Sequence, residues 1–112
     1  MYFSFYILCK KTMTKKTFFL WLSDKDSKLQ IIGTVQAYKL AMNLVWEYFG
    51  GGTIHQWQGF FKHDDGTIVI ENTLIIETIT DKEHGQFIKQ LKKLFNQESI
   101  LVEINNPSVA FE

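Results

Sequence analysis

The sequence predicts a small α+β domain in which two helices cover one face of a four-stranded antiparallel sheet. Two runs rich in β-branched and aromatic residues flank the turn His63-Asp64-Asp65-Gly66, which indicates a hairpin over residues 50–77. One stretch before this hairpin and one after it carry apolar residues at helical spacing. The 112 residues suffice for a single domain with a two-layer core.

The first half of the chain predicts a strand followed by a helix. Residues 17–22 are apolar on both faces and predict a strand, and residues 28–32 are a possible short extension. Thr34 is a suitable N-cap for a helix that runs to about Phe49 and stops at the three glycines 50–52. The apolar stripe of this helix consists of Ala37, Leu40, Ala41, Leu44, Val45 and Tyr48.

The second half predicts the hairpin, a second helix and a last strand. Thr80 and Glu83 have the spacing of a capping box, which places the start of a helix that runs to about Asn96. Its apolar face consists of Phe87, Ile88, Leu91, Leu94 and Phe95. Residues 99–104 predict the last strand, and residues 105–107 predict a turn before a possible short edge strand. The order β-α-β-β-α-β is the ferredoxin-like arrangement.

Residues 1–12 are set apart from the predicted domain. An apolar run precedes four lysines, which is the reverse of the order in a secretory signal. We interpret residues 1–12 as a leader before a natural start at Met13 or as a disordered tail, with an extra strand as the other reading. The ferredoxin-like domain then spans residues 13–112.

Composition excludes several classes of function. Twelve basic and twelve acidic residues cancel, which gives no electrostatic footprint for nucleic acid. The single cysteine cannot form an internal disulfide, which fits the cytoplasm. The apolar run at the N-terminus is shorter than the roughly 20 residues of a membrane span, so no membrane association is expected. The three histidines do not form a pattern that predicts a metal site.

The hairpin contains the residue that we single out for function. Glu71 is expected to share a face with Gln58 and Phe60, opposite Phe60 if two residues form the turn and opposite Gln58 if four residues do. The other face, with His55 and Trp57, would then be the apolar one that the helices cover. A carboxylate on a half-apolar surface needs a partner. That partner is either a ligand or a structural ion pair, for example with Lys62.

The predicted sheet has apolar side chains on both faces. Helices cover only one face of a ferredoxin-like sheet. When the other face contacts water, apolar and polar residues alternate more regularly along the strands than they do here. We therefore expect the open face to be buried by self-association, usually with closed symmetry. Glu71, Gln58 and Phe60 would then lie at or near a boundary between copies of the chain.

Short motifs in and around the hairpin resemble those of the phage S-adenosylmethionine (SAM) lyases, long described as SAM hydrolases. They are Gly52-Thr53, Gly59-Phe60, Glu71-Asn72-Thr73-Leu74 and the stretch from Gln97 to Val102. The resemblance spans about residues 17–104. It implies a trimer built like the PII signalling proteins, with active sites between subunits.

The resemblance also implies a function and its residues. The reaction would cleave SAM to methylthioadenosine and homoserine lactone without a cofactor or a metal, and would serve a phage against restriction in the host cytoplasm. Glu71 matches the essential carboxylate of the family, and Phe60 stands where the family commonly has tyrosine. Phe60, Gln58 and Gln97 are the expected substrate-binding residues.

Two questions remain open at the level of sequence. The alternative function is that of a non-enzymatic oligomer that binds a nucleotide or a protein, with Glu71 as a structural or ligand contact. The three glycines at 50–52 either end the first helix or bring the backbone close to a ligand.

Overall fold

The computed structural model describes the backbone of residues 13–109 and the side chains of residues 13–60 and 62–105. The expected leader or tail at residues 1–12 lies outside these described residues.

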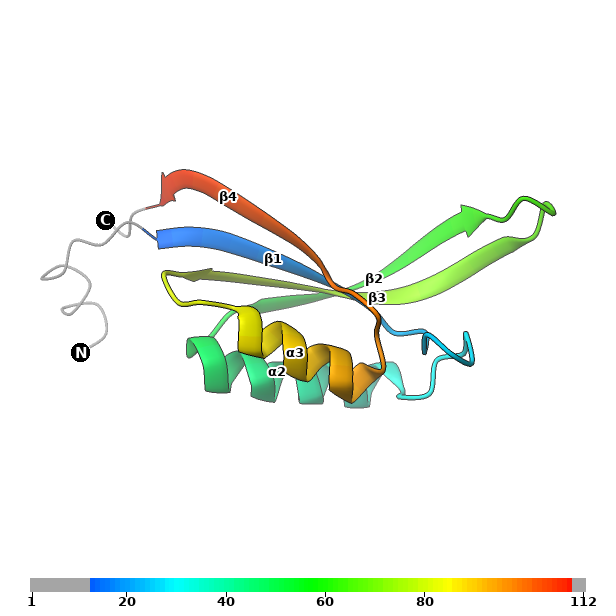
Figure 1. Ribbon diagram of the computed structural model, residues 1–112, viewed down its shortest axis with the longest axis horizontal. Helices are drawn as coiled ribbons and strands as arrows, with labels where there is room; N and C mark the ends of the chain where they lie inside the picture. The colour runs from blue at the N-terminus through cyan, green and yellow to red at the C-terminus, as the bar shows by residue number, and fades with distance from the viewer. Residues whose placement is uncertain (1–12, 110–112) are drawn as a thin grey trace, which may run out of the picture.

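Four strands form one sheet, and two helices lie on one of its faces (Figure 1). In chain order the elements are β1 (Met13–Trp21), α2 (Thr34–Phe49), β2 (Thr53–Lys62), β3 (Ile68–Thr80), α3 (Gly85–Phe95) and β4 (Leu101–Val109). The strand order is β2-β3-β1-β4, and all neighbouring strands are antiparallel. This topology confirms the predicted ferredoxin-like βαββαβ fold.

The hydrophobic core lies between the sheet and the helices. Side chains alternate along a strand, and every second residue of β1 and β3 is buried against the helices. The fully buried members on the sheet are Phe18, Leu20, Leu74 and Ile76. They pack against the predicted helical stripes, of which Ala37, Ala41, Val45, Phe87 and Leu91 are the most buried. The sheet face without helices is called the open face below.

Both predicted helix starts are wrong in detail. Thr34 is the first residue of α2 rather than its cap, and its hydroxyl accepts a hydrogen bond from Gln30. Helix α3 starts at Gly85 after His84, and the Thr80 hydroxyl instead accepts a hydrogen bond from the Lys82 N–H. Strand β3 runs to Thr80, so the residues of the expected capping box belong to the strand and the turn after it.

The predicted ends of the first and last strands also need correction. Strand β1 begins at Met13, before the expected start at residue 17. Strand β4 continues through the expected turn at residues 105–107, because β1 supplies a partner as far as the pair of Met13 with Val109. A register shift between Met13 and Lys15 accommodates this extension.

The register of the hairpin contradicts the predicted pairing of Glu71. Strands β2 and β3 meet at the pair Lys62 and Ile68, so residues 63–67 form the loop. The His63 N–H donates to the Thr67 carbonyl, and Gly66 has a φ of 90°, which suits glycine. A loop with an odd number of residues shifts the register by one position, and such a shift exchanges the faces of one strand relative to the other.

As a result, Glu71 lies opposite Gly59, while Phe60 lies opposite Ile70. Glu71 shares the open face with Trp57 and His55, and Phe60 and Gln58 lie on the helix side of the sheet. Trp57 was expected on the face that the helices cover, and this prediction is wrong, since 62% of the residue is exposed.

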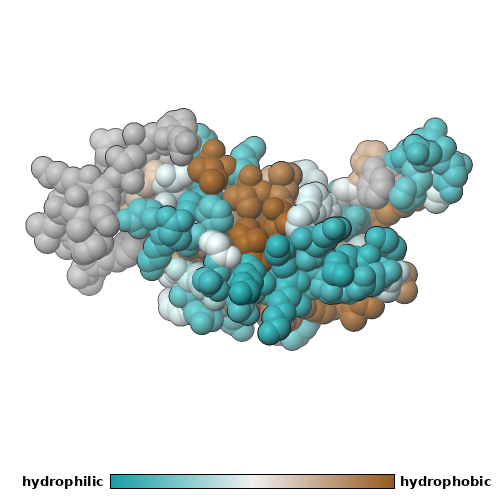
Figure 2. Space-filling view, viewed as in Figure 1, coloured by the Kyte–Doolittle hydropathy of each residue, from teal (hydrophilic) through white to brown (hydrophobic). Residues whose placement is uncertain are grey.

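The far half of the hairpin extends beyond the rest of the sheet. The last residue of β1 that pairs with β3 is Trp21, opposite Thr73, so residues 58–72 form a two-stranded arm. Figure 1 shows this arm reaching past the ends of both helices. Figure 2 shows a hydrophilic tip on the arm and apolar surface along it.

Candidate functional site

The carboxylate of Glu71 stands at the base of the arm with an empty position opposite it. Its cross-strand partner is Gly59, and a Cβ built on Gly59 meets no atom within 4 Å. Glu71 is half-buried, and no described residue forms a hydrogen bond or an ion pair with it. A partly desolvated carboxylate without a partner is a favourable place for a cation. The expected structural ion pair with Lys62 is not formed.

An aromatic residue occupies the diagonal position to Glu71 on the same face of the two strands. Trp57 lies two residues before Gly59 on β2, opposite Thr73, and its side chain is largely exposed. Indole is the side chain that attracts cations most strongly through its ring face. We call Glu71, Gly59 and Trp57 the acidic slot. The chemistry of the acidic slot suits a positively charged small molecule.

A network of charges lies further along the open face. Glu77 accepts a hydrogen bond from the Lys15 ammonium at 3.0 Å and pairs with His55 Nε2 at 2.9 Å. These contacts, with Lys15 as the larger influence, hold the pKa of the Glu77 carboxyl below its usual range. Both oxygens of Glu77 are thus engaged, in contrast to those of Glu71.

The helix side of the arm carries a row of amides. Gln58 Nε2 donates to Asn72 Oδ1 at 3.2 Å, and Asn72 Nδ2 donates to Gln30 Oε1 at 2.6 Å. Gln30 Nε2 in turn donates to the Thr34 hydroxyl at the start of α2. These groups border a cavity of about 580 Å³ lined by Thr34, Gln56, Trp57, Gln58 and Asn72. Gln58 therefore lines a polar groove on the helix side of the arm.

Phe60 lies on the helix side of the arm, beyond Gln58. It is 80% exposed, and its cross-strand partner Ile70 is 69% exposed. The structure brings Phe60 and Gln58 to one face, as expected, but places Glu71 on the other face of the same chain.

Gln97 has a structural contact in this chain. Its Nε2 donates to the Ser23 carbonyl at 2.7 Å and to the Phe95 carbonyl at 3.2 Å. It thereby holds the loop after β1 against the end of α3. The neighbouring Asn96 also contacts that loop through Asp24 at 2.6 Å.

Trp57 and the Lys15–Glu77–His55 network were not identified as functional candidates from the sequence. A loop with an even number of residues, as predicted, would put His55 and Trp57 on the face that the helices cover. The Asp65 carboxylate accepts a hydrogen bond from the Thr67 N–H and so closes the longer loop. The Asp-Gly pair by itself also suits a two-residue turn, so it does not fix the loop length.

Within the described part of the chain, no group of three or more metal-ligating side chains comes together. Among the same residues, no helix combines the length and the apolar character that crossing a membrane requires.

Comparisons with known proteins identify the fold. No family model matches the chain, and no curated protein matches it. Among solved structures, the chain is similar to a phage SAM lyase in complex with S-methyl-5'-thioadenosine, with a TM-score of 0.57 and 20% identity. That match covers 84% of this chain and 81% of the other. A phage SAM lyase in the apo state gives a TM-score of 0.56 at 19% identity, with coverage of 84% and 80%. The chain therefore has the fold of the phage SAM lyases, the family that its hairpin motifs resemble.

Proposed function

We propose that this protein is a SAM lyase that converts SAM to methylthioadenosine and homoserine lactone. The observation that carries the proposal is the Glu71 carboxylate, half-buried, unpaired and opposite a glycine, on a chain with the fold of the phage SAM lyases. The lyase motif in the sequence singles out the same residue. A phage would use such an activity in the host cytoplasm to deplete the methyl donor of restriction-modification systems.

The proposed reaction needs no external nucleophile. The carboxylate of the substrate attacks its own γ-carbon, a C–O bond forms, and the bond from that carbon to sulfur breaks. The electron pair goes to sulfur, which changes from a sulfonium to the neutral thioether of methylthioadenosine. No proton is transferred, so the protein must fold the methionine chain into the attack geometry and exclude water.

The acidic slot supplies what this reaction requires. Glu71 would hold the substrate ammonium and so orient the chain for attack. Trp57 lies beside it and would face the sulfonium. Methylthioadenosine leaves as a neutral product, and no proton is transferred. A site that binds the methionine chain in its folded form therefore favours the reaction through geometry rather than through acid or base catalysis.

Phe60, Gln58 and Gln97 take a different place in this proposal. Phe60 and Gln58 lie on the face of the arm opposite Glu71, so they cannot border the same ligand as the Glu71 of their own chain without passing around the strand. They would contact a substrate held by a neighbouring copy in the expected homo-oligomer, a trimer by resemblance. Gln97 would act indirectly, through the loop that it holds.

A non-enzymatic role is the second candidate. The expected aromatic wall, Phe60, lacks the hydroxyl that is common in the family, and its separation from Glu71 within one chain favours simple binding of a nucleotide or a protein. In that case the exposed apolar arm would be a contact surface rather than part of a reaction site.

Incubation of the purified protein with SAM distinguishes the two functions. The lyase produces methylthioadenosine and homoserine lactone, separated by chromatography and identified by mass. Homoserine in place of the lactone at the earliest time points would indicate attack by water and contradict the intramolecular step. An absence of methylthioadenosine after prolonged incubation would refute the enzyme assignment.

A further inference from the structure

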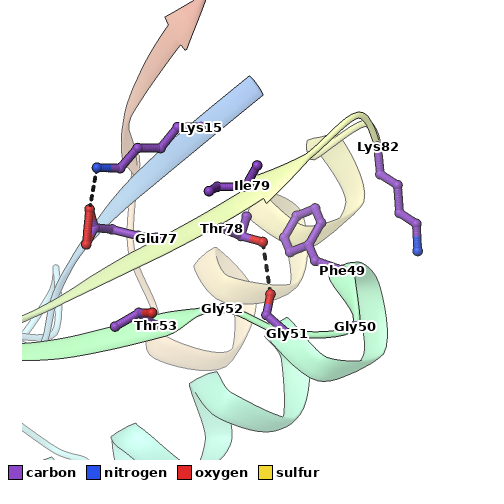
Figure 3. A pocket seen from close by; sticks show the side chains of 10 residues that line it. All are labelled: Lys15, Phe49, Gly50, Gly51, Gly52, Thr53, Glu77, Thr78, Ile79 and Lys82. Carbon is purple, nitrogen blue, oxygen red and sulfur yellow. Dashed lines mark hydrogen bonds and ion pairs between the residues drawn. The ribbon is translucent and has the colours of Figure 1, made fainter. Parts of the chain in front are cut away.

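A second cavity lies at the opposite end of β2 from the arm (Figure 3). Its volume is about 700 Å³, and it is bordered by residues 50–52, by the end of β3 and by Phe49, Lys15 and Lys82. It forms because β2 begins only at Thr53, opposite Glu77, while β3 continues to Thr80. The edge of β3 beyond Glu77 therefore has the three glycines beside it instead of a paired strand.

The three glycines hold the backbone close to β3. A Cβ on Gly52 would lie 2.7 Å from the Glu77 carbonyl oxygen, so only glycine fits there without a shift. The Thr78 hydroxyl donates to the Gly51 carbonyl at 2.9 Å and fixes this approach. Among the described residues, none accepts a hydrogen bond from the N–H of Gly51 or Gly52. Two backbone donors are thus available to a ligand.

The charges around this cavity favour an anion. Its charged lining consists of Lys15, Lys82 and Glu77, which leaves one positive charge in excess. Glu77 is already engaged by Lys15 and by His55, so it offers little to a cation. Backbone N–H groups and ammonium groups together bind phosphate or carboxylate oxygens well.

The same cavity has an apolar part. Figure 3 shows the ring of Phe49 and the side chain of Ile79 at its border, and both side chains are half-buried. Phe49 also packs on Phe87 with ring centroids 4.9 Å apart, which keeps its ring in place. A flat heteroaromatic group can lie against such a rigid ring.

We propose that this cavity, which we call the glycine pocket, binds a nucleotide, with its base against Phe49 and its phosphate near Lys82 and the glycine N–H groups. The site is separate from the acidic slot of the same chain. Glu71 and Glu77 are six positions apart on β3, which is a distance of roughly 20 Å along a strand. The acidic slot favours a cation and the glycine pocket an anion, so the nucleotide site goes beyond the proposed lyase activity.

Calorimetric titration of the full-length protein with AMP tests this proposal. Gly51→Phe is the blocking variant, because a Cβ at Gly51 meets no atom within 4 Å and the fold should tolerate the ring. Lys82→Met removes one charge of the pocket. Gly85→Phe and Lys89→Met are the matched controls, since a Cβ at Gly85 also meets no atom within 4 Å and Lys89 is exposed on α3.

We expect saturable AMP binding that Gly51→Phe abolishes and that both controls retain. Lys82→Met should weaken AMP binding about fivefold, as for one partly screened charge contact, and should leave adenosine binding unchanged. Glu71→Gln should bind AMP like the wild type, which separates this site from the lyase. No saturable binding at millimolar AMP, equal binding by Gly51→Phe, or equal binding of inorganic phosphate and AMP would overturn the proposal.

Discussion

The residue on which the proposed function of this chain depends is Glu71. Its two neighbours in the sheet explain why it is unpaired: Gly59 offers no side chain across the strand, and Trp57 offers only a ring. Glu77, six residues further along the same face of β3, shows the contrasting case, with two basic partners. Position in the register, rather than residue type, therefore separates a carboxylate that can bind a ligand from one that is already satisfied.

A second residue, His84, predicts how stability depends on pH. The buried Lys16 ammonium lies 3.0 Å from His84 Nδ1 and 2.6 Å from the Lys82 carbonyl oxygen. Burial, and then the Lys16 charge, lower the pKa of His84 below its usual value of 6.5. The unfolded chain therefore takes up this proton more readily than the folded one. The contribution is fully present above pH 6.5 and is lost as the pH falls through the pKa of the folded state.

Urea denaturation at pH 7.5 and pH 5.5 measures this effect. We expect the free energy of unfolding to fall more over this interval in the wild type than in His84→Asn, which keeps an acceptor for Lys16 but does not titrate. An equal decrease in both proteins would show that His84 is not responsible.

At the scale of elements, the junction between α2 and β2 is the most tightly constrained connection. Gly50 ends α2 with a φ of 81°, and Gly52 then passes against β3 with no room for a side chain. A Cβ at Gly51, between these two residues, would meet no atom within 4 Å. Three identical residues in the sequence thus have three different structural requirements.

Gly52→Ala should destabilise the fold by about 1–3 kcal/mol, because its Cβ would lie 2.7 Å from the Glu77 oxygen and 3.0 Å from Val45 Cγ1. Gly51→Ala should change the free energy of unfolding by less than about 0.5 kcal/mol. Denaturant titration of both variants provides the comparison. Equal stabilities would mean that the close approach of residue 52 to β3 is not maintained in solution.

The elements also show which features the sequence could predict. Element order, topology and the apolar helical stripes follow from periodicity and glycine placement. The structure confirms them except at Leu94, which was expected on the apolar face of the second helix but is 41% exposed. The faces of the hairpin do not follow, because a single residue in the loop reverses them and local turn signals permit several loop lengths. The family resemblance points to Glu71 without the register, whereas the proposal that Trp57 lies beside it depends on the register.

At the scale of the whole molecule, the arm requires an explanation beyond one chain. An isolated two-stranded hairpin is marginally stable in water, and in this one Phe60, Ile68 and Ile70 are exposed by more than half, as is Trp57 at its base. Contact with other copies of the chain would bury these side chains. Self-association, predicted from the two-sided strands, therefore remains the expectation that best accounts for the arm.

We expect the wild type to sediment as an oligomer well above the 13.1 kDa of one chain. Ile70→Lys should shift it toward the monomer, because a lysine ammonium is costly to bury in an apolar contact. Leu29→Lys, at a comparably exposed position in the loop after β1, should not change the sedimentation. A wild-type protein that sediments as a monomer would contradict this account of the arm.

The central claim is that an unpaired carboxylate on the open face positions SAM for its own cleavage. The most direct test compares the rate of methylthioadenosine formation by the wild type with that of Glu71→Gln and of Glu103→Gln, an exposed glutamate on β4. Loss of more than about 100-fold in Glu71→Gln alone, with unchanged sedimentation, is the predicted result for removal of a positioning charge. A rate in Glu71→Gln equal to that of the wild type would contradict the account.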